Sequence, residues 1–459
     1  MENNEMWEDV EQKIAGFMQK TKIPGLSLAV IKGQEVIYSK GFGNRDISKN
    51  LPVTPDTLFG VGSLTKVFTC IAIMQLVEQG KLSIEDPVKK YIPFKLGLED
   101  KPVKIKHLMS HSSGIPNLGT ASVLISRHAP VEETWIPFAS KDDFYTFVNG
   151  AKEEVVDEPE KRFFYFNTGF ALLGEIIEAV SGLKYEKYVK EFILNRLKMN
   201  RSTFLEEEFN KDKDKMTAYI AEKNKPVVKK HPFDQFICAA GGLLCSVNEF
   251  THFLFMLLKD GKFENNQIIS SASLQEMFTI RIETPLGYFG RSGYGFGLAI
   301  SEDFLGYKLI SHGGSTGMSS AHLSVIPELN LAVITEANVG NGMGGLISQT
   351  VLSMLIGKKP EEVIQFYKIE EKMELFSGEY ANYKGLSKIK VFIENGMLLA
   401  ETKFAETTTR YVLIPEDTKL TDNKFYIYAF GNKTSVHFEI KENDQIDLFI
   451  ERNCFHKNK

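Results

Sequence analysis

The stretch Gly60-Val61-Gly62-Ser63-Leu64-Thr65-Lys66 is the starting point for this chain, because it places an S-x-x-K motif at the head of an apolar segment. Apolar residues follow at the spacing of one helical face: Val67, Phe68, Cys70, Ile71, Met74 and Val77. Gly80 then supplies a helix stop. Residues three apart share a helix face, so the Ser63 hydroxyl and the Lys66 amine are expected close enough to exchange a proton. Unpaired N–H groups at the helix start also favour a developing oxyanion there.

Two further S-x-x-K matches begin at Ser181 and Ser387. Ser181 follows an apolar helical run and precedes Gly182, so we predict that it belongs to a helix C-cap. Ser387 leads into alternating, strand-like sequence, in which residues three apart point to opposite faces. Ser63 is therefore the candidate nucleophile, and a structural N-cap is the alternative role for it.

Composition excludes several classes of partner. The chain has 459 residues, which predicts two or three domains. Its formal charge of -5, with lysines scattered among glutamates, argues against nucleic-acid binding. Apolar runs fall short of the roughly 18 residues of a membrane span. The acidic N-terminus lacks the basic and apolar regions of a secretory signal, so we expect a cytoplasmic protein with no membrane partner.

The sequence offers little support for a metal or cofactor. Cys70, Cys238, Cys245 and Cys454 are widely spaced and are expected to be free thiols, most of them buried. The stretch 107–111 can place two histidines on one helical face, but no glutamate lies between them as in H-E-x-x-H. We expect no metal and no cofactor at the catalytic site.

The order of predicted elements indicates an α/β fold for the first 360 residues. A helix is predicted over 5–20, a hairpin of strands over 26–31 and 36–42, further strands over 307–311, 322–326 and 331–335, and a helix over 346–356. Helical patterns fill most of the interval between, with an insertion over roughly 80–260. This order suits an antiparallel sheet that joins distant parts of the chain, with helices on both sides and a ligand cleft beside the insertion.

The last hundred residues have a different sequence pattern. A charged linker is predicted over 361–372, followed by a separate all-β domain over 373–459. Strands are expected over 389–393, 397–401, 425–430, 435–440 and 446–450, with Asn395-Gly396 as a hairpin turn. We therefore predict a small antiparallel β-barrel or sandwich.

Two more motifs accompany Ser63. Tyr165-Phe166-Asn167 precedes an apolar helical stretch, and His312-Gly313-Gly314-Ser315 ends a predicted strand. Each is weak alone, since a second Y-x-N occurs at Tyr380-Ala381-Asn382 and a histidine before two glycines is common in tight turns.

Taken in order, S-x-x-K, Y-x-N and H-x-G resemble the marks of the penicillin-recognising serine hydrolases, which include class C β-lactamases, D-alanyl-D-alanine carboxypeptidase B, D-aminopeptidases and related esterases. The resemblance covers roughly residues 5–355 and implies a β-lactamase/penicillin-binding-protein fold. Three more segments are similar to the family pattern: Ile23-Pro24-Gly25, His111-Ser112-Ser113-Gly114-Ile115-Pro116 and Ala240-Gly241-Gly242-Leu243. The whole chain resembles archaeal serine peptidases that end in a lipocalin-like domain, which implies a lipocalin-like barrel at the C-terminus.

The resemblance also implies roles for the residues. Ser63 would be the nucleophile that carries an acyl group. Lys66 and Tyr165 would share the general acid and base work: a cationic Lys66 favours tyrosinate at Tyr165, whereas a desolvated Lys66 loses its own proton more readily. Which of the two deprotonates Ser63 stays open. On the family pattern, His111 is structural.

The remaining motif residues would bind the substrate. Asn167 would hydrogen-bond a substrate amide or Lys66, and the backbone N–H groups of Ser63 and Ser315 would form the oxyanion hole. Gly313 and Gly314 would leave room for the substrate backbone.

The chain departs from the family pattern at three places. His312 stands where a K-T-G lysine is usual, and as a weaker, pH-dependent cation it puts recognition of a free carboxylate in doubt. Phe166 replaces the usual serine and Pro159-Glu160 the usual Pro-Gly, and both are expected to change the wall of the cleft.

The leading functional hypothesis is a serine peptidase that acts on small peptides and tolerates D-amino acids. A carboxylesterase with the same site is the first alternative, and a catalytically silent penicillin-binding-like scaffold is the second. For the C-terminal domain, the alternatives are an apolar ligand, a cap over the cleft, a solvated accessory domain and homo-oligomerisation.

Overall fold

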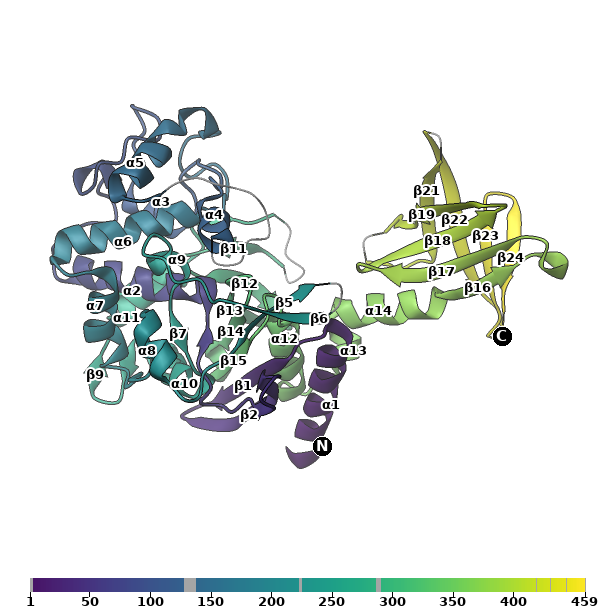
Figure 1. The fold of residues 1–459 in the computed structure, drawn as a ribbon, viewed down its shortest axis with the longest axis horizontal. Helices are drawn as coiled ribbons and strands as arrows, with labels where there is room; N and C mark the ends of the chain where they lie inside the picture. Colours follow the sequence, from purple (N-terminus) through teal and green to yellow (C-terminus); the bar gives the residue numbers. More distant parts are fainter. Residues whose placement is uncertain are drawn as a thin grey trace. The chain divides into compact units, whose positions relative to one another are not determined.

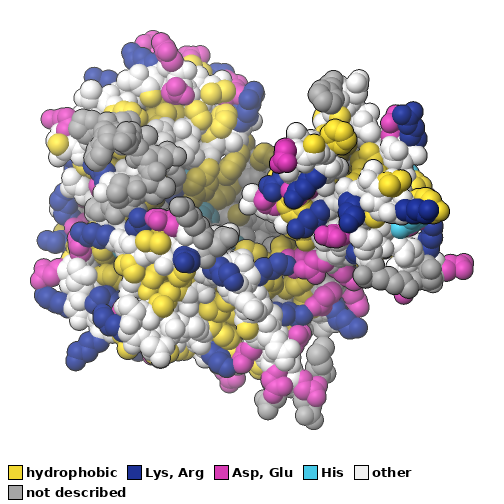
Figure 2. All heavy atoms as spheres, turned by 45° about the vertical axis from the view of Figure 1, so that its right-hand side comes forward, with side chains coloured by type: hydrophobic (Ala, Val, Ile, Leu, Met, Phe, Trp, Pro, Cys, Tyr) yellow, Lys and Arg dark blue, Asp and Glu magenta, His cyan; other side chains and the backbone are white. Residues whose placement is uncertain are grey.

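The computed structural model describes residues 3–127, 138–222, 225–285, 290–417, 419–429, 431–442 and 444–458. Contacts along the chain divide it into two compact units, Met1–Leu352 and Ser353–Lys459. Figure 1 shows helices and strands together in the first unit and mainly strands, after helix α14, in the second. No helix in the described ranges is long and apolar enough to cross a membrane. Figure 2 shows positive and negative side chains interspersed over the face that it draws.

A nine-stranded antiparallel sheet organises the first unit, in the order β10-β11-β12-β13-β14-β15-β1-β2-β3. Its strands are β1 (Gly25–Lys32), β2 (Glu35–Asp46), β3 (Leu51–Pro52), β10 (Ile282–Glu283), β11 (Ser292–Tyr294), β12 (Ala299–Phe304), β13 (Tyr307–Ser315), β14 (Ser320–Ile326) and β15 (Leu331–Ala337). Strand β1 pairs with β15, with Val30 opposite Val333. The prediction that the first hairpin joins the last strands is therefore confirmed.

Helices cover both faces of this sheet. Tyr38 on β2 stacks on Trp7 of α1 (Asn3–Thr21), with ring centroids 4.2 Å apart. The next residue, Ser39, hydrogen-bonds Asn248 of α10 (Val247–Leu258) at 2.9 Å. Because successive strand residues point to opposite faces, α1 and α10 lie on opposite sides of the sheet. The predicted C-terminal helix of this unit is α12 (Gly344–Leu355).

The insertion is mainly helical, as predicted. It contains α3 (Ile105–Met109), α4 (Thr120–Ser126), α5 (Lys141–Gly150), α6 (Asn167–Ser181), α7 (Tyr185–Val189), α8 (Glu206–Lys211), α9 (Cys238–Gly241) and α10, with α2 (Thr65–Glu78) before it and α11 (Ser271–Met277) beyond it. Short pairs of strands lie among the helices: β4 (Phe59–Gly60) with β7 (Leu244–Cys245), β5 (Ala218–Glu222) with β6 (Lys225–Lys229), and β8 (Lys262–Phe263) with β9 (Asn266–Gln267).

Helix α2 differs from its prediction in one respect. Every residue from Thr65 to Leu76 is buried, so apolar contacts surround the helix and are not confined to one face. A helix that is buried all round loses the amphipathic pattern of a surface helix. Lys66, on its first turn, is therefore enclosed on all sides.

The second unit begins with helices. The stretch expected as a linker folds into α13 (Pro360–Val363) and α14 (Gln365–Phe376). The strands that follow are β16 (Gly378–Ala381), β17 (Lys388–Glu394), β18 (Met397–Phe404), β19 (Thr407–Val412), β20 (Ile414–Pro415), β21 (Lys424–Ala429), β22 (Asn432–Ile440), β23 (Ile446–Ile450) and β24 (Asn453–Lys457). Residue 430, the end of one predicted strand, lies outside the described residues.

These strands form a nine-stranded antiparallel sheet, in the order β19-β18-β17-β16-β24-β23-β22-β21-β20. The two edge strands, β19 and β20, are separated along the chain only by Leu413, so the sheet curls round toward closure. Apolar side chains fill its interior, where Phe376 stacks on Phe438 with ring centroids 4.2 Å apart. The predicted lipocalin-like barrel is confirmed.

Candidate active site

The structure brings the two ends of the S-x-x-K motif together. Ser63 lies in a short 3-10 turn, Gly62–Leu64, that leads directly into α2. The Lys66 amine is 2.9 Å from the Ser63 hydroxyl. The N-cap residue of α2, Leu64, makes no capping hydrogen bond through its side chain, and neither does the N-cap residue of the 3-10 turn. The Ser63 hydroxyl therefore faces Lys66 and does not serve as a helix cap.

Lys66 is completely buried, and its surroundings set its charge. Burial lowers the pKa of Lys66 from its ordinary value to about 7, since desolvation disfavours the ammonium form. The amine also donates to the carbonyl oxygen of Ala240 at 2.7 Å. This second contact comes from α9, within the Ala240-Gly241-Gly242-Leu243 stretch, and it aims the amine at Ser63.

Tyr165 stands next to this pair, just before α6. The Lys66 Nζ atom is 5.0 Å from the centroid of the Tyr165 ring. Burial raises the pKa of Tyr165 above its usual value, and hydrogen bonding to Ser63 opposes the shift only in part. Of the two alternatives for the proton transfer, burial favours the one with a neutral Tyr165 phenol, because desolvation outweighs the hydrogen bond that would stabilise the tyrosinate.

His111 fixes the backbone that carries Tyr165. Its carbonyl oxygen accepts a hydrogen bond from the N–H of Phe164 at 2.9 Å, and its Nδ1 accepts one from the N–H of Phe166, also at 2.9 Å. Its ring centroid lies 4.2 Å from that of Tyr165. Because Nδ1 accepts, the ring proton of neutral His111 is on Nε2. His111 thus acts as the structural residue that the family resemblance implied.

His312 faces the site from β13, but without a charge. Its Nε2 atom lies 2.8 Å from the hydroxyl of Tyr294. Burial, reinforced by the nearby Lys66, lowers the pKa of His312 to about 3. The expectation that His312 is a weak, pH-dependent cation is wrong, because its environment excludes the imidazolium over the physiological range.

Two backbone stretches meet beside Ser63. A Cβ atom added to Gly62, whose φ is +53°, would lie 2.5 Å from the backbone nitrogen of Ser315. One added to Gly314 would lie 2.8 Å from the backbone nitrogen of Ser63. The close approach of these two backbone stretches, which carry the Ser63 and Ser315 N–H groups, therefore depends on glycine at both positions.

The other motif residues have different surroundings. Asn167 opens α6 and is partly exposed, and its amide makes no hydrogen bond within the described ranges. Phe166 is fully buried and packs on Gly169. That it changes the wall of the cleft stays a prediction. Glu160 adopts a left-handed φ of +69°, a conformation that glycine adopts without strain.

Sequence reasoning missed two contacts of this site. The Ala240 carbonyl is a backbone atom 174 positions from Lys66, so only its glycine-rich neighbourhood marked it. Tyr294 lies in a three-residue strand, too short for a visible alternation, and no motif includes it. Both contacts are long-range and have no local signal.

The geometry is that of an acylating serine site with a lysine and a tyrosine beside the nucleophile, on a mixed helix and sheet fold. Residues 10–350 match the beta-lactamase family model, and residues 360–456 match the Pab87 octamerisation domain. The chain therefore belongs to the beta-lactamase family, within the penicillin-recognising serine hydrolases.

Relatives extend this comparison. Protein flp of Staphylococcus aureus (strain N315) is 27% identical over 341 residues, which are 74% of this chain and 64% of that protein. Penicillin-binding protein 4* of Bacillus subtilis (strain 168) is 27% identical over 330 residues, 67% of this chain and 66% of that protein. The octameric penicillin-binding protein homologue from Pyrococcus abyssi is 38% identical, with a TM-score of 0.91 over 98% of this chain and 99% of that one. The match thus spans less than two thirds of the Staphylococcus protein but 99% of the Pyrococcus chain.

Proposed function

We propose that this protein is a serine hydrolase that works through a covalent acyl-enzyme on Ser63. The observation that carries the proposal is the buried Lys66 amine 2.9 Å from the Ser63 hydroxyl, with a pKa of about 7. At neutral pH a large share of Lys66 is then the free amine, which accepts a proton. The catalytically silent scaffold is disfavoured because all three reactive side chains are present and in contact.

The proposed steps follow from these contacts. Neutral Lys66 takes the proton of Ser63 as its oxygen attacks the substrate carbonyl. The backbone N–H groups of Ser63 and Ser315 stabilise the oxyanion. Tyr165, a neutral phenol, donates its proton to the leaving group and is reprotonated from Lys66. Water then releases the acyl group by the reverse path.

We infer that the substrate is a small peptide whose recognition does not require a free carboxylate. The neutral His312 supplies no cation at the position where the family's lysine would meet a substrate carboxylate. Asn167, unbonded within the described residues and partly exposed, supplies an amide partner for a substrate peptide group. Tolerance of D-amino acids stays a prediction. A carboxylesterase is the second candidate, because an uncharged site of this kind also suits an ester.

We propose that the C-terminal unit assembles copies of the chain, with residues 1–360 as the hydrolase domain, 361–372 as a helical connection and 373–459 as the barrel. The match to an octamerisation domain supports this role. Large apolar side chains are also exposed on the barrel, with Leu386 81% and Phe404 87% exposed. Cytoplasmic location stays a prediction.

A substrate panel tests the proposed activity. It contains matched L- and D-peptides, each with a free or an amidated C-terminus, short-chain esters and a chromogenic cephalosporin. We expect hydrolysis of peptides with little difference between free and amidated C-termini. Turnover of esters alone would favour the esterase, and a strict requirement for a free carboxylate would contradict the inference from His312.

A further inference from the structure

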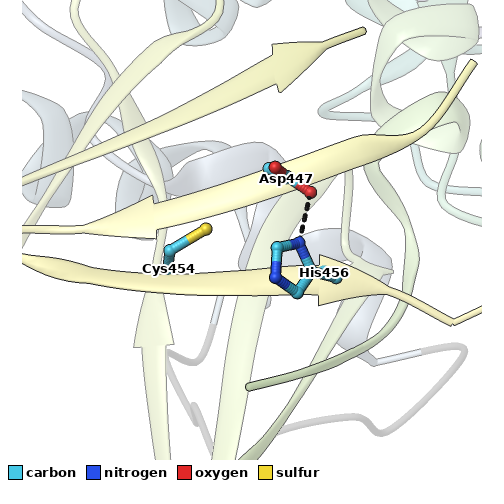
Figure 3. Close-up of side chains that lie close together, drawn as sticks. All are labelled: Asp447, Cys454 and His456. Carbon is cyan, nitrogen blue, oxygen red and sulfur yellow. Dashed lines mark hydrogen bonds and ion pairs between the residues drawn. The ribbon is translucent and has the colours of Figure 1, made fainter. Parts of the chain in front are cut away.

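Three metal-ligating side chains meet on the outside of the barrel, in the second unit. Asp447 of β23 lies opposite His456 of β24 in the strand register, and Cys454 precedes His456 by two residues on the same face. One donor atom from each lies within 4.8 Å of the other two. Figure 3 shows the carboxylate, thiol and imidazole turned toward one another, with the His456 Nδ1 atom 2.7 Å from Asp447 Oδ1.

The donor types fit a zinc-like divalent cation. Thiolate sulfur, imidazole nitrogen and carboxylate oxygen are the ligands that zinc uses, at roughly 2.0 to 2.3 Å. A tetrahedral ion at those distances holds neighbouring donors about 3.3 to 3.8 Å apart. The carboxylate and imidazole, now at 2.7 Å with a proton between them, need to separate by only a fraction of an ångström. His456 is exposed and free to make that adjustment.

The local charges are compatible with a cation, with one competitor. The buried carboxylate of Asp447 has an ion pair between its Oδ2 atom and the Lys441 ammonium. Lys441 is half-exposed and can turn into solvent. Burial first, and the neighbouring Asp447 carboxylate second, raise the pKa of the Cys454 thiol. A bound cation would favour the thiolate instead.

We propose that Asp447 Oδ1, Cys454 Sγ and His456 Nδ1 form a binding site for a zinc-like divalent cation, with water in the fourth position. On binding, the Cys454 thiol releases its proton to solvent, and His456 takes the tautomer with its proton on Nε2. The carboxylate and thiolate then balance the charge of the ion.

A cation bound at this site would hold β24, the last strand of the barrel, against its neighbour. Strand β24 pairs with β16 at two positions of the register, through Lys457 and His456, and Asn458 next to it donates a backbone hydrogen bond to the Glu379 carbonyl at 2.8 Å. Its other neighbour is β23, and the cation would link these two strands through side chains. Binding to the folded state alone raises stability in proportion to the logarithm of cation concentration.

Cobalt titration of the full-length protein, after treatment with a chelator, tests the site. We expect one Co²⁺ per chain, with a thiolate-to-cobalt charge-transfer band in the near ultraviolet. Cys454→Ser should remove the band, and His456→Gln should weaken binding at least 100-fold. His437→Gln, on the neighbouring strand β22, and Cys238→Ser, in the first unit, should change neither result.

Substitution of Lys441 tests the direction in which the affinity for the cation changes. Lys441→Met removes the competing ammonium, so it should tighten Co²⁺ binding about tenfold, whereas a merely structural role of the cluster predicts no gain. A wild-type experiment avoids any failure of variants to fold: Zn²⁺ should protect Cys454, but not Cys238, from iodoacetamide. The proposal is overturned if the band is missing, if it survives Cys454→Ser, if Lys441→Met does not tighten binding, or if Zn²⁺ leaves Cys454 alkylation unchanged.

Discussion

Burial acts in opposite directions on the two proton-transfer groups beside Ser63. Desolvation penalises a charge, so it lowers the pKa of the Lys66 ammonium and raises that of the Tyr165 phenol. Both groups are therefore driven toward their neutral forms. A neutral amine accepts a proton and a neutral phenol donates one, which separates their roles as base and acid.

The pH dependence of turnover follows from Lys66. With a pKa of about 7 in the free enzyme, the reactive amine is protonated below that value. We expect kcat/KM to fall about tenfold per pH unit below pH 7 and to level off above it. Rates of a neutral peptide substrate between pH 5 and 9 measure this. The fall of kcat/KM below pH 7 should persist in His312→Gln, since His312 stays neutral above about pH 3. A rate independent of pH across 6 to 8 would contradict Lys66 as the base.

Substitutions of the two groups should cost turnover and not binding alone. Lys66→Ala and Tyr165→Phe are each expected to lose about 10² to 10⁴ in kcat, the range typical of acid–base groups. Steady-state kinetics measure it. Tyr380→Phe is the matched control, because Tyr380 belongs to the other Y-x-N match and its hydroxyl donates to the carbonyl of Phe376 in the second unit. Near-wild-type kcat in Tyr165→Phe would rule out its proposed role.

At the scale of elements, the site depends on contacts among the Ser63 turn, α6, α9 and β13. The turn meets β13 so closely that side chains are excluded at Gly62 and Gly314. The nucleophile is thus positioned by packing of distant segments and not by the motif alone.

Gly62→Ala tests that contact. A Cβ at Gly62 would collide with the Ser315 backbone, so we expect kcat/KM to fall at least about 100-fold as the oxyanion donors separate. Gly80→Ala is the matched control, because Gly80 has a similar φ of +67° and nothing within 4 Å of an added Cβ. It should cost about 1 to 2 kcal/mol of stability, measured by urea unfolding, and leave kcat/KM nearly unchanged. Equal kinetic effects of both would show that strain, and not the collision, is responsible.

The sequence predicts elements that carry a strong local pattern. The hairpin of β1 and β2, the strands β13 to β15 and the Asn395-Gly396 turn all have such a pattern, and all are present. Strands β10 and β11 are two and three residues long, too short to show alternation.

The site is predictable to the same extent. The three motifs contain Ser63, Lys66, Tyr165 and His312, so these residues can be identified from the sequence. The charge state of His312 and the partners Ala240 and Tyr294 depend on tertiary burial, which no local pattern records.

At the scale of the whole molecule, the chain consists of two units with separate cores. The cluster around α2 and α6 belongs to the first unit, and the cluster around Phe376 and Phe438 belongs to the second. The reactive residues all lie in the first unit. Exposed apolar side chains on the barrel are therefore available for assembly without a direct part in the chemistry.

The oligomeric state should depend on the exposed apolar side chains of the barrel. Replacing Leu386 and Phe404 together by serine is expected to shift the protein from an oligomer to smaller species, because apolar area is lost from the interface. Light scattering coupled to size exclusion measures the mass. Val156→Ser is the control, since Val156 is 55% exposed on the first unit. A wild-type monomer, or an unchanged mass in the double variant, would contradict this assignment of the interface.

Acylation of Ser63 is the central claim, and a fluorophosphonate probe followed by intact-mass and peptide mapping tests it most directly. We predict one adduct per chain, on Ser63, which is lost in Ser63→Ala and retained in Ser181→Ala, whose serine belongs to the cap of α6. An unlabelled wild-type protein, or an adduct that persists on another residue in Ser63→Ala, would contradict it.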